Sequence, residues 1–383
     1  MRNWLLPEHI ADILPATARQ VETAKAAMLE LFRTGGYELV SPPMLEYIDS
    51  LMAESDPGLA LKTFRVVDQL SGRQLGVRAD ITPQVARIDA HLLAERTGVT
   101  RLCYAGSVLH ARPNGLMSSR EPLQIGAELY GYAGTEADLE IVELMLASLR
   151  LVKVDGVRLD LGHIAIFRGL ASASGLSAQA SRELLDVLQT KDVATIRELV
   201  ADVAEPFRSA FLVLPELYGR GEVLDKARTK LPSLPEIELG LMQLAAVGRA
   251  LGDSVDVSYD LAELRGDSYH TGLMFAAYAP GWSESIARGG RYDNVGRSFG
   301  RGRPATGFSF DLRDLIRILP QRHHEQAIRV AARLLPDARA EVDALRRRGE
   351  VVIIDYLGES AQALNCDREL VRAAEGWQVV SFN

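Results

Sequence analysis

The chain has 383 residues, 47% of them hydrophobic and 25% charged, which is typical of a soluble globular protein of two or three domains. No apolar run is long enough to span a bilayer, and Pro7 and Glu8 interrupt the N-terminal segment where a signal peptide would be apolar, so we expect a cytoplasmic protein without membrane association. The net charge of −8, with no long basic run, gives no support to nucleic-acid binding. Cys103 and Cys366 form neither a disulfide framework nor a metal cluster, and we predict no metal and no cofactor.

The first predicted elements are a helix, a strand and a hairpin. Thr17 to Gln20 has the pattern of a capping box, which predicts a helix from there to about Thr34, ended by two glycines. A short strand at 37–40 follows and stops before a pair of prolines. Residues 64–72 then indicate a hairpin.

The segment from Gly76 to Gln84 carries Asp80 and Thr82 two residues apart. Read by itself, Asp80 caps the start of a helix that runs to about Ala94. A carboxylate and a hydroxyl can also hold an ammonium group, because charge-assisted hydrogen bonds are the stronger kind. Both interpretations can hold together.

Two strands joined by a polar loop are predicted at 102–110 and 122–130. The second strand alternates between apolar and polar residues, so Gln124 and Glu128 share one face. Such alternation is the ordinary pattern of a half-solvated antiparallel hairpin. An amide and a carboxylate on one face would also form a cradle for a polar ligand.

The rest of the chain predicts a helix at 136–151, a strand at 157–162, a helical insertion at about 170–250 and a strand at 256–260. His163, next to a glycine, is expected to be structural. Residues 321–383 predict strands at about 328–333, 351–355 and 378–382 with helices between them, which is a small α/β unit. The pair His323 and His324 fits a linker better than a metal site.

Several of these segments together resemble the signature motifs of class II aminoacyl-tRNA synthetases, and most closely those of histidyl-tRNA synthetases. Val108 to Gly131 is similar to F-R-x-E-R-P, a loop and R-Q-F-H-Q-x-G-x-E-x-F-G. The segment around Asp80 is similar to the motif L-R-P-E-G-T, and residues 264–275 are similar to R-G-L-D-Y-Y-x-x-x-x-F. Residues 287–294 are similar to G-G-R-Y-D-x-L, and residues 304–315 are similar to the third class II motif. The resemblance covers roughly residues 5–320, with the motifs in the family's order.

The resemblance implies an α+β fold of the class II synthetase-like catalytic core, an antiparallel sheet flanked by helices. The expected domains are residues 1–320, which include the helical insertion at about 170–250, and residues 321–383, the small C-terminal α/β unit. The helix and strand at 17–40 resemble the first class II motif, which implies a homodimer through the core.

The resemblance also implies a histidine-binding pocket. In the family the residues at Asp80 and Thr82 hold the α-ammonium group, the arginine at Arg265 acts on the carboxylate, and the aromatic residues hold the imidazole. Without the resemblance, Tyr269 and His270 are equally consistent with a strand that has one solvated face. The implied histidine-binding set is Asp80, Thr82, Gln124, Glu128, Arg265, Tyr269 and His270.

The departures from the family pattern fall on the residues that hold ATP. The arginine for the α-phosphate falls on Leu109 and the nearby glutamate on Ala111, while Asp311 and Asp314 replace a glycine and a second arginine of the third motif. Leucine has no donor for a phosphate, and an aspartate repels one. We therefore predict no adenylate formation and no catalytic residues.

A synthetase-like chain with a histidine pocket and no nucleotide clamp resembles the regulatory subunits of ATP phosphoribosyltransferase. That resemblance implies a short-form catalytic subunit as partner in a hetero-octamer, a role in the first step of histidine biosynthesis, L-histidine as the feedback effector, and no tRNA. The alternatives are a divergent histidyl-tRNA synthetase, another synthetase paralogue with residual amino-acid activation, and a scaffold that binds no histidine.

Overall fold

The computed structural model describes residues 5–52, 57–113, 115, 118–262, 270–293, 295–319 and 326–382. The chain divides into two compact units, residues 1–320 and 321–383. The described residues do not include Arg265 and Tyr269 of the predicted pocket or the pair His323 and His324. In the described part of the chain, no helix has the length and apolar character that crossing a bilayer requires.

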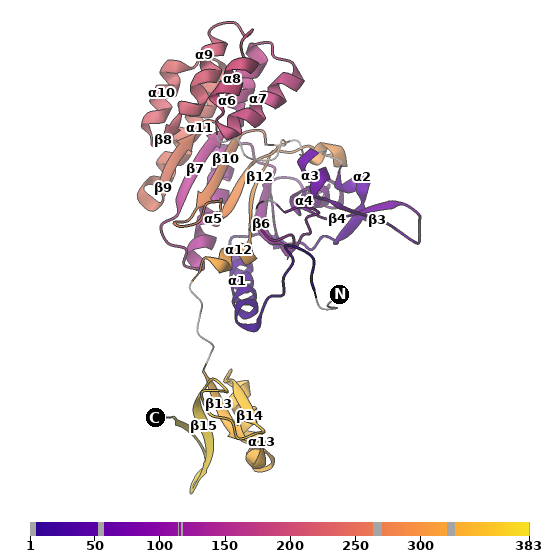
Figure 1. Cartoon of the computed structure of the whole chain (residues 1–383), viewed down its shortest axis with the longest axis vertical. Coiled ribbons are helices and arrows are strands. Elements are labelled where there is room, and N and C mark those ends of the chain that lie inside the picture. Colours follow the sequence, from indigo (N-terminus) through magenta and orange to yellow (C-terminus); the bar gives the residue numbers. More distant parts are fainter. Residues whose placement is uncertain are drawn as a thin grey trace. The chain divides into compact units, whose positions relative to one another are not determined.

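One mixed sheet of nine strands forms the centre of the larger unit (Figure 1). Its strands pair antiparallel, except that β1 and β7 run parallel to β5 and β9 respectively. This agrees with the predicted α+β class. In spatial order the strands are β1 (Glu38–Leu39), β5 (Thr100–Ser107), β6 (Leu123–Tyr130), β12 (Ala305–Asp311), β11 (Ala287–Arg291), β10 (Leu273–Tyr278), β7 (Arg158–His163), β9 (Asp256–Asp260) and β8 (Tyr218–Gly219).

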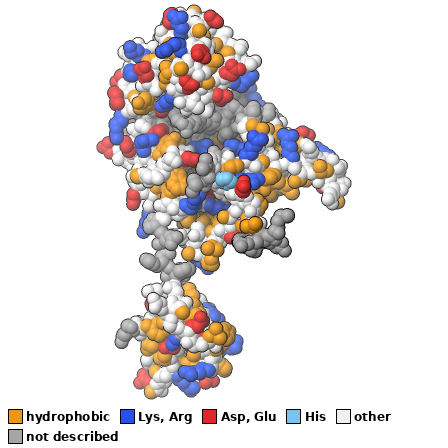
Figure 2. Space-filling view, viewed as in Figure 1, with side chains coloured by type: hydrophobic (Ala, Val, Ile, Leu, Met, Phe, Trp, Pro, Cys, Tyr) orange, Lys and Arg blue, Asp and Glu red, His pale blue; other side chains and the backbone are white. Residues whose placement is uncertain are grey.

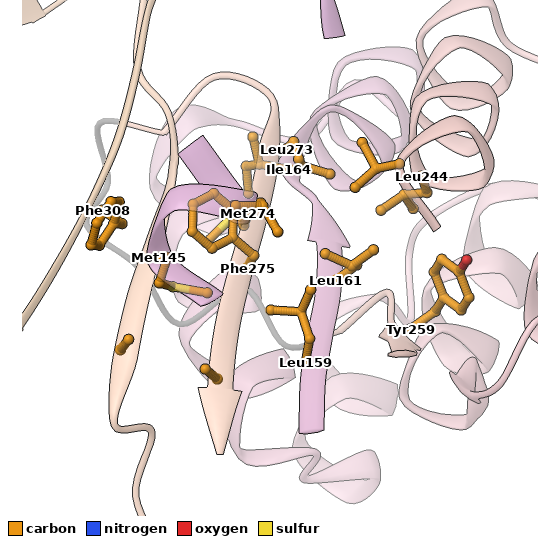
Figure 3. Packing of buried hydrophobic residues seen from close by; sticks show 14 of the residues in the cluster. Met145, Leu159, Leu161, Ile164, Leu244, Tyr259, Leu273, Met274, Phe275 and Phe308 are labelled. Atoms are coloured by element: carbon orange, nitrogen blue, oxygen red, sulfur yellow. The ribbon is translucent and has the colours of Figure 1, made fainter. Parts of the chain in front are cut away.

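Helices α1 (Pro15–Thr34), α5 (Thr135–Leu151) and α12 (Leu312–Arg317) cover one face of this sheet. Their apolar sides meet the sheet in the main core, where Met145 of α5 lies beside Phe275 and Phe308 (Figure 3). Burying side chains of this size stabilises the fold by about 1.5–3 kcal/mol each. The predicted capping box at the start of α1 is wrong, because the helix begins two residues earlier, at Pro15, and no side chain caps it.

The helical insertion gathers near strands β7, β9 and β8, toward the β8 end of the sheet (Figure 1). It contains α6 (Ile164–Ala173), α7 (Ala178–Thr190), α8 (Val193–Leu199), α9 (Phe207–Val213), α10 (Glu222–Lys230) and α11 (Pro235–Leu251). Helix α11 packs on α6, α5 and β7 and joins the insertion to the main core. His163 is buried here and shares a 2.7 Å hydrogen bond with Gln243, and burial lowers its pKa to about 4. A neutral, packed imidazole fits the structural role that the sequence predicted.

The other face of the large sheet, near β5, β6 and β12, is covered by a smaller layer. This layer holds the three-stranded sheet β2 (Leu45–Tyr47), β4 (Gln74–Val77) and β3 (Phe64–Val67), with the helices α2 (Ile48–Leu51), α3 (Pro57–Lys62) and α4 (Thr82–Arg87). Strands β3 and β4 form the predicted hairpin. Helix α4 ends earlier than expected and continues as one π-helical turn, Ile88–Leu92.

The C-terminal unit is a four-stranded sheet with one helix, α13 (Leu335–Arg347), packed on it. The strand order is β14 (Val352–Asp355), β13 (Ala327–Ala331), β15 (Cys366–Ala373) and β16 (Gly376–Ser381). The helix expected after residue 355 is wrong, since strand β15 occupies that part of the chain. Its sequence, CDRELVRA, has no apolar face of period two, which explains why the strand was missed.

Candidate ligand-binding cavity

A cavity of about 200 Å³ lies between the large sheet and the layer that contains α3 and α4. Residues of β6, β11 and β12 line one side of it, and residues of α3 and the start of α4 line another. Its volume is below the roughly 300–1,000 Å³ of sites for drug-sized ligands, which suits a metabolite of amino-acid size. In the space-filling view, acidic, basic and histidine side chains meet near the middle of this unit (Figure 2).

Glu128 lies at the buried floor of the cavity, with 1% of its surface exposed. One carboxylate oxygen accepts hydrogen bonds of 3.0 Å from the hydroxyls of Thr82 and Tyr104, and the other accepts a short one from Tyr292. Burial raises the pKa of Glu128 to about 8, although the three hydroxyls act in the opposite direction. An ionised carboxylate has room for about four hydrogen bonds, and a nearby cation favours the ionised form, so Glu128 can accept one more bond when a cationic ligand enters the cavity.

Gly307 is the reason that the Glu128 carboxylate fits on the sheet. The two residues are direct cross-strand partners, and a Cβ atom on Gly307 would overlap a carboxylate oxygen of Glu128. Any other residue at 307 would force the carboxylate away from its three hydroxyl donors.

Asp80, Thr82 and Gln124 form a connected hydrogen-bond network beside Glu128. The Asp80 carboxylate accepts the backbone N–H of Thr82, the first residue of α4, at 3.0 Å, and the side-chain amide of Gln124 at 2.7 Å. The Gln124 amide oxygen accepts the N–H of Ile81 at 2.9 Å. Asp80 therefore lines the cavity and holds the first residue of α4, but the predicted cap is wrong, because the N-cap of this helix is Ile81 and no side chain caps it.

His270 lines the cavity next to Gly290 of strand β11. It is 7% exposed, and its ring lies so close to Gly290 that a Cβ there would come within 2.6 Å of the ring carbon Cδ2. Gly290 pairs with Gly307, so His270 and Glu128 lie over neighbouring strands on the same face of the sheet.

Five of the seven predicted histidine-binding residues line this one cavity: Asp80, Thr82, Gln124, Glu128 and His270. The other two, Arg265 and Tyr269, lie outside the described residues.

Two site residues were missed in the sequence, Tyr104 and Tyr292. Both are buried, and burial raises the pKa of each phenol well above its usual range, so each keeps the proton that it donates to Glu128. Tyr292 stands in the G-G-R-Y-D segment, and that motif was the available signal. The neighbouring Arg291 forms a buried ion pair with Asp138 at 3.0 Å, which ties the end of β11 to α5.

Leu109, Asp311 and Asp314 stand at positions that correspond to ATP-binding residues in the resembled motifs. Leu109 is half-buried and does not line the cavity, whereas its neighbours Val108 and His110 do. Asp311 and Asp314 line it. Asp311 accepts the backbone N–H groups of Arg313 at 2.9 Å and Leu123 at 3.1 Å, and so caps α12. Burial, with repulsion from Asp314, raises the pKa of Asp311 to about 7.

No group of histidine, cysteine, aspartate or glutamate side chains within the described ranges has the arrangement of a metal site. The chemistry that the cavity offers is recognition of a small polar molecule by carboxylates, hydroxyls and an imidazole.

Comparison with known proteins places this chain in a family. Residues 9–315 match the family model for histidyl-tRNA synthetase, and residues 325–380 match the model for the C-terminal domain of the ATP phosphoribosyltransferase subunit HisZ. A curated ATP phosphoribosyltransferase regulatory subunit from Chromobacterium violaceum is 73% identical over 383 residues, the whole of both chains. The chain belongs to the family of ATP phosphoribosyltransferase regulatory subunits.

Other members and structural neighbours agree with this family. A regulatory subunit from Laribacter hongkongensis is 62% identical over 98% of this chain and 97% of its own. The structure of an ATP phosphoribosyltransferase regulatory subunit/histidyl-tRNA synthetase from Bacillus halodurans has a TM-score of 0.84 and 26% identity, over 95% of this chain and 96% of its own. A histidyl-tRNA synthetase from Nostoc, with a TM-score of 0.81, 18% identity and coverage of 100% and 97%, shares the fold.

Proposed function

We propose that this chain is a non-catalytic regulatory subunit that acts with a short-form ATP phosphoribosyltransferase catalytic subunit in the first step of histidine biosynthesis. Its role is to activate that partner and to transmit feedback inhibition by L-histidine. The main support is the 73% identity to a curated regulatory subunit over the whole of both chains, together with the match of residues 325–380 to the HisZ C-terminal domain.

The effector site in this proposal is the cavity above Glu128. Asp80, Thr82 and Glu128 supply acceptors for the ammonium group of histidine, and His270 contacts the rest of the ligand. Arg265 and Tyr269 complete the proposed site on the strength of the family motif alone. A histidine bound here regulates the partner only if it binds two states of the complex unequally.

The proposal excludes adenylate formation by this chain. Activation of an amino acid requires positive groups around the transferring phosphate. At the positions of the family's two ATP-binding arginines this chain has Leu109, which carries no donor, and Asp314, which is negative. The nearby Asp311 adds a second carboxyl to that side of the cavity.

The proposed assembly is a homodimer through the core that joins the catalytic subunit in a hetero-octamer in the cytoplasm, without tRNA. Its mass can be measured by light scattering on the co-purified proteins. A complex of another stoichiometry would change this part of the proposal and leave the regulatory role intact.

The function is tested by assaying the catalytic subunit alone, with this chain, and with this chain plus L-histidine. We expect activation by the chain and inhibition by histidine only when the chain is present. Activation without histidine sensitivity would make the chain a scaffold. ATP–pyrophosphate exchange at a synthetase-like rate by the chain alone would instead favour a histidyl-tRNA synthetase.

A further inference from the structure

Among the described residues that form its floor, the cavity lacks a partner for the negative end of an amino acid, and Arg265, which the family motif assigns to the carboxylate, lies outside the described residues. Gln124 is the only amide among them, and its two N–H bonds are already used within the protein. They go to Asp80 at 2.7 Å and to the hydroxyl of Ser309 at 3.2 Å. Gln124 therefore positions Asp80 and Ser309, and it cannot donate to a ligand carboxylate without losing one of these bonds.

Two cationic side chains line the same cavity, Lys62 at the end of α3 and Arg288 in β11. Neither forms a hydrogen bond or an ion pair with another residue that the structure describes. Both lie near the buried His110. Burial is the main cause that lowers the pKa of His110, and the positive charges of Lys62 and Arg288 lower it further. Two unpaired cations beside a neutral imidazole make this the positive side of the cavity.

The positive side lies directly next to the acidic floor. Arg288 is the cross-strand partner of Ser309, and the side chains of such partners stand about 5 Å apart at their Cβ atoms on one face of the sheet. The Ser309 hydroxyl is bonded to the Gln124 amide, which is bonded in turn to Asp80. One hydroxyl and one amide thus separate the base of Arg288 from the Asp80 carboxylate. That order matches an α-amino acid, whose two charges are attached to the same carbon.

The acidic groups on this side have other roles. Asp311 is bonded to two backbone N–H groups, and Asp314 pairs with Arg317 at 3.2 Å. Glu284 lies against Gly115 of the loop between β5 and β6. We propose that Arg288, assisted by Lys62, binds the carboxylate of the amino-acid effector and so distinguishes an amino acid from the corresponding amine. This inference rests on the proposed function, because it assigns a role within the proposed effector site.

The test compares L-histidine with histamine, which has the same imidazole and ammonium groups but no carboxylate. Calorimetry with the full chain is expected to show that Arg288→Ala weakens histidine binding by about 10- to 100-fold, as for the loss of a charge-assisted hydrogen bond. Histamine binding is expected to change less than twofold. Arg288→Lys is expected to restore part of the loss, and Lys62→Ala to have a smaller effect of the same kind. Arg249→Ala, on the exposed side of α11, is the matched control and is expected to bind both ligands as the unmodified chain does.

Four results would overturn the inference. Equal weakening of histidine and histamine in Arg288→Ala would indicate a structural role, and unchanged histidine binding would exclude any role. Binding of pyrophosphate that is lost in Arg288→Ala, while histidine binding remains, would make this a phosphate site. If the unmodified chain, alone and with its catalytic partner, binds no histidine, the proposed effector site and this inference fail together, whereas the first three results leave the proposed function intact.

Discussion

The floor of the cavity around Glu128 and the side that contains Asp311 and Asp314 are built in opposite ways. We call the second the phosphate side, because its positions correspond to ATP-binding residues in the motif that the sequence resembles. At the floor, hydroxyls from α4, β5 and the end of β11 converge on Glu128 and hold a carboxylate out of water. At the phosphate side, Asp311 is bonded to backbone of its own fold and Asp314 to a neighbouring arginine. The difference is that side-chain hydroxyls hold Glu128, whereas Asp311 and Asp314 are used for helix capping and local ion pairing.

Glu128→Gln tests the floor and is expected to have the largest effect. The substitution keeps the size of the side chain but removes the negative charge that meets the ligand's ammonium group. A buried cation without its partner costs several kcal/mol, so histidine affinity should fall roughly 100-fold or more. Calorimetry measures this loss, and Glu143→Gln on the exposed side of α5 is the control. Affinity within threefold of the unmodified chain would show that histidine binds elsewhere.

Gly307→Ala tests whether the strand must leave room for Glu128. The added methyl group would overlap the carboxylate and push it from its three donors. We expect histidine affinity to fall about tenfold or more and the unfolding free energy to fall by about 1–3 kcal/mol, as is usual when a packed site is overfilled. Gly221→Ala is the control, because a Cβ atom there meets no other atom. A variant that binds histidine normally would contradict the described position of Glu128.

The pH dependence of stability tests the burial of Glu128. Its pKa of about 8 in the folded chain lies above the ordinary 4.5, so the folded state holds this proton more tightly than the unfolded chain does. The stabilisation is complete below about pH 4.5 and is lost as the pH rises to about 8. Glu128→Gln has no proton to lose, so its unfolding free energy should not fall in this way. As the pH rises from about 4.5 to 8, the variant should therefore gain several kcal/mol in stability relative to the unmodified chain, at about 1.4 kcal/mol per pKa unit. Urea unfolding at a series of pH values measures this, and parallel curves for the two proteins would contradict it.

Asp311→Asn tests the phosphate side and should have the smallest effect. Its pKa of about 7 is raised by burial and by Asp314, so the unmodified chain loses stability as the pH rises from about 4 to 7. Asparagine keeps an oxygen that can accept the N–H groups of Leu123 and Arg313. The variant should gain roughly 1–3 kcal/mol at pH 8 and little at pH 4, with unchanged histidine binding. Asp192→Asn is the control with the opposite sign. Asp192 is the exposed cap of α8 and its pKa is lowered, so its ionised form stabilises the fold, and the variant should be less stable than the unmodified chain at pH 8.

The sequence predicted the parts of the site that depend on local patterns. Period two along 122–130 placed Gln124 and Glu128 on one face, and the spacing of Asp80 and Thr82 indicated the helix start that lines the cavity, although Asp80 is not the cap of that helix. Tyr104 and Tyr292 were missed because their bonds to Glu128 depend on the register of strands far apart in the chain. Strand β15 was missed for a related reason: its pairing with β13 and β16 gives it a place in the sheet that its own charged sequence does not indicate.

The central claim is that the cavity receives histidine but no longer carries out chemistry on ATP. The most direct test titrates the purified chain with L-histidine and then with Mg²⁺–ATP, and follows ATP–pyrophosphate exchange in the same preparation. The account predicts saturable histidine binding that Glu128→Gln abolishes, with no heat of ATP binding and no exchange above the rate without protein. Exchange that requires histidine and proceeds at a synthetase-like rate would contradict the account.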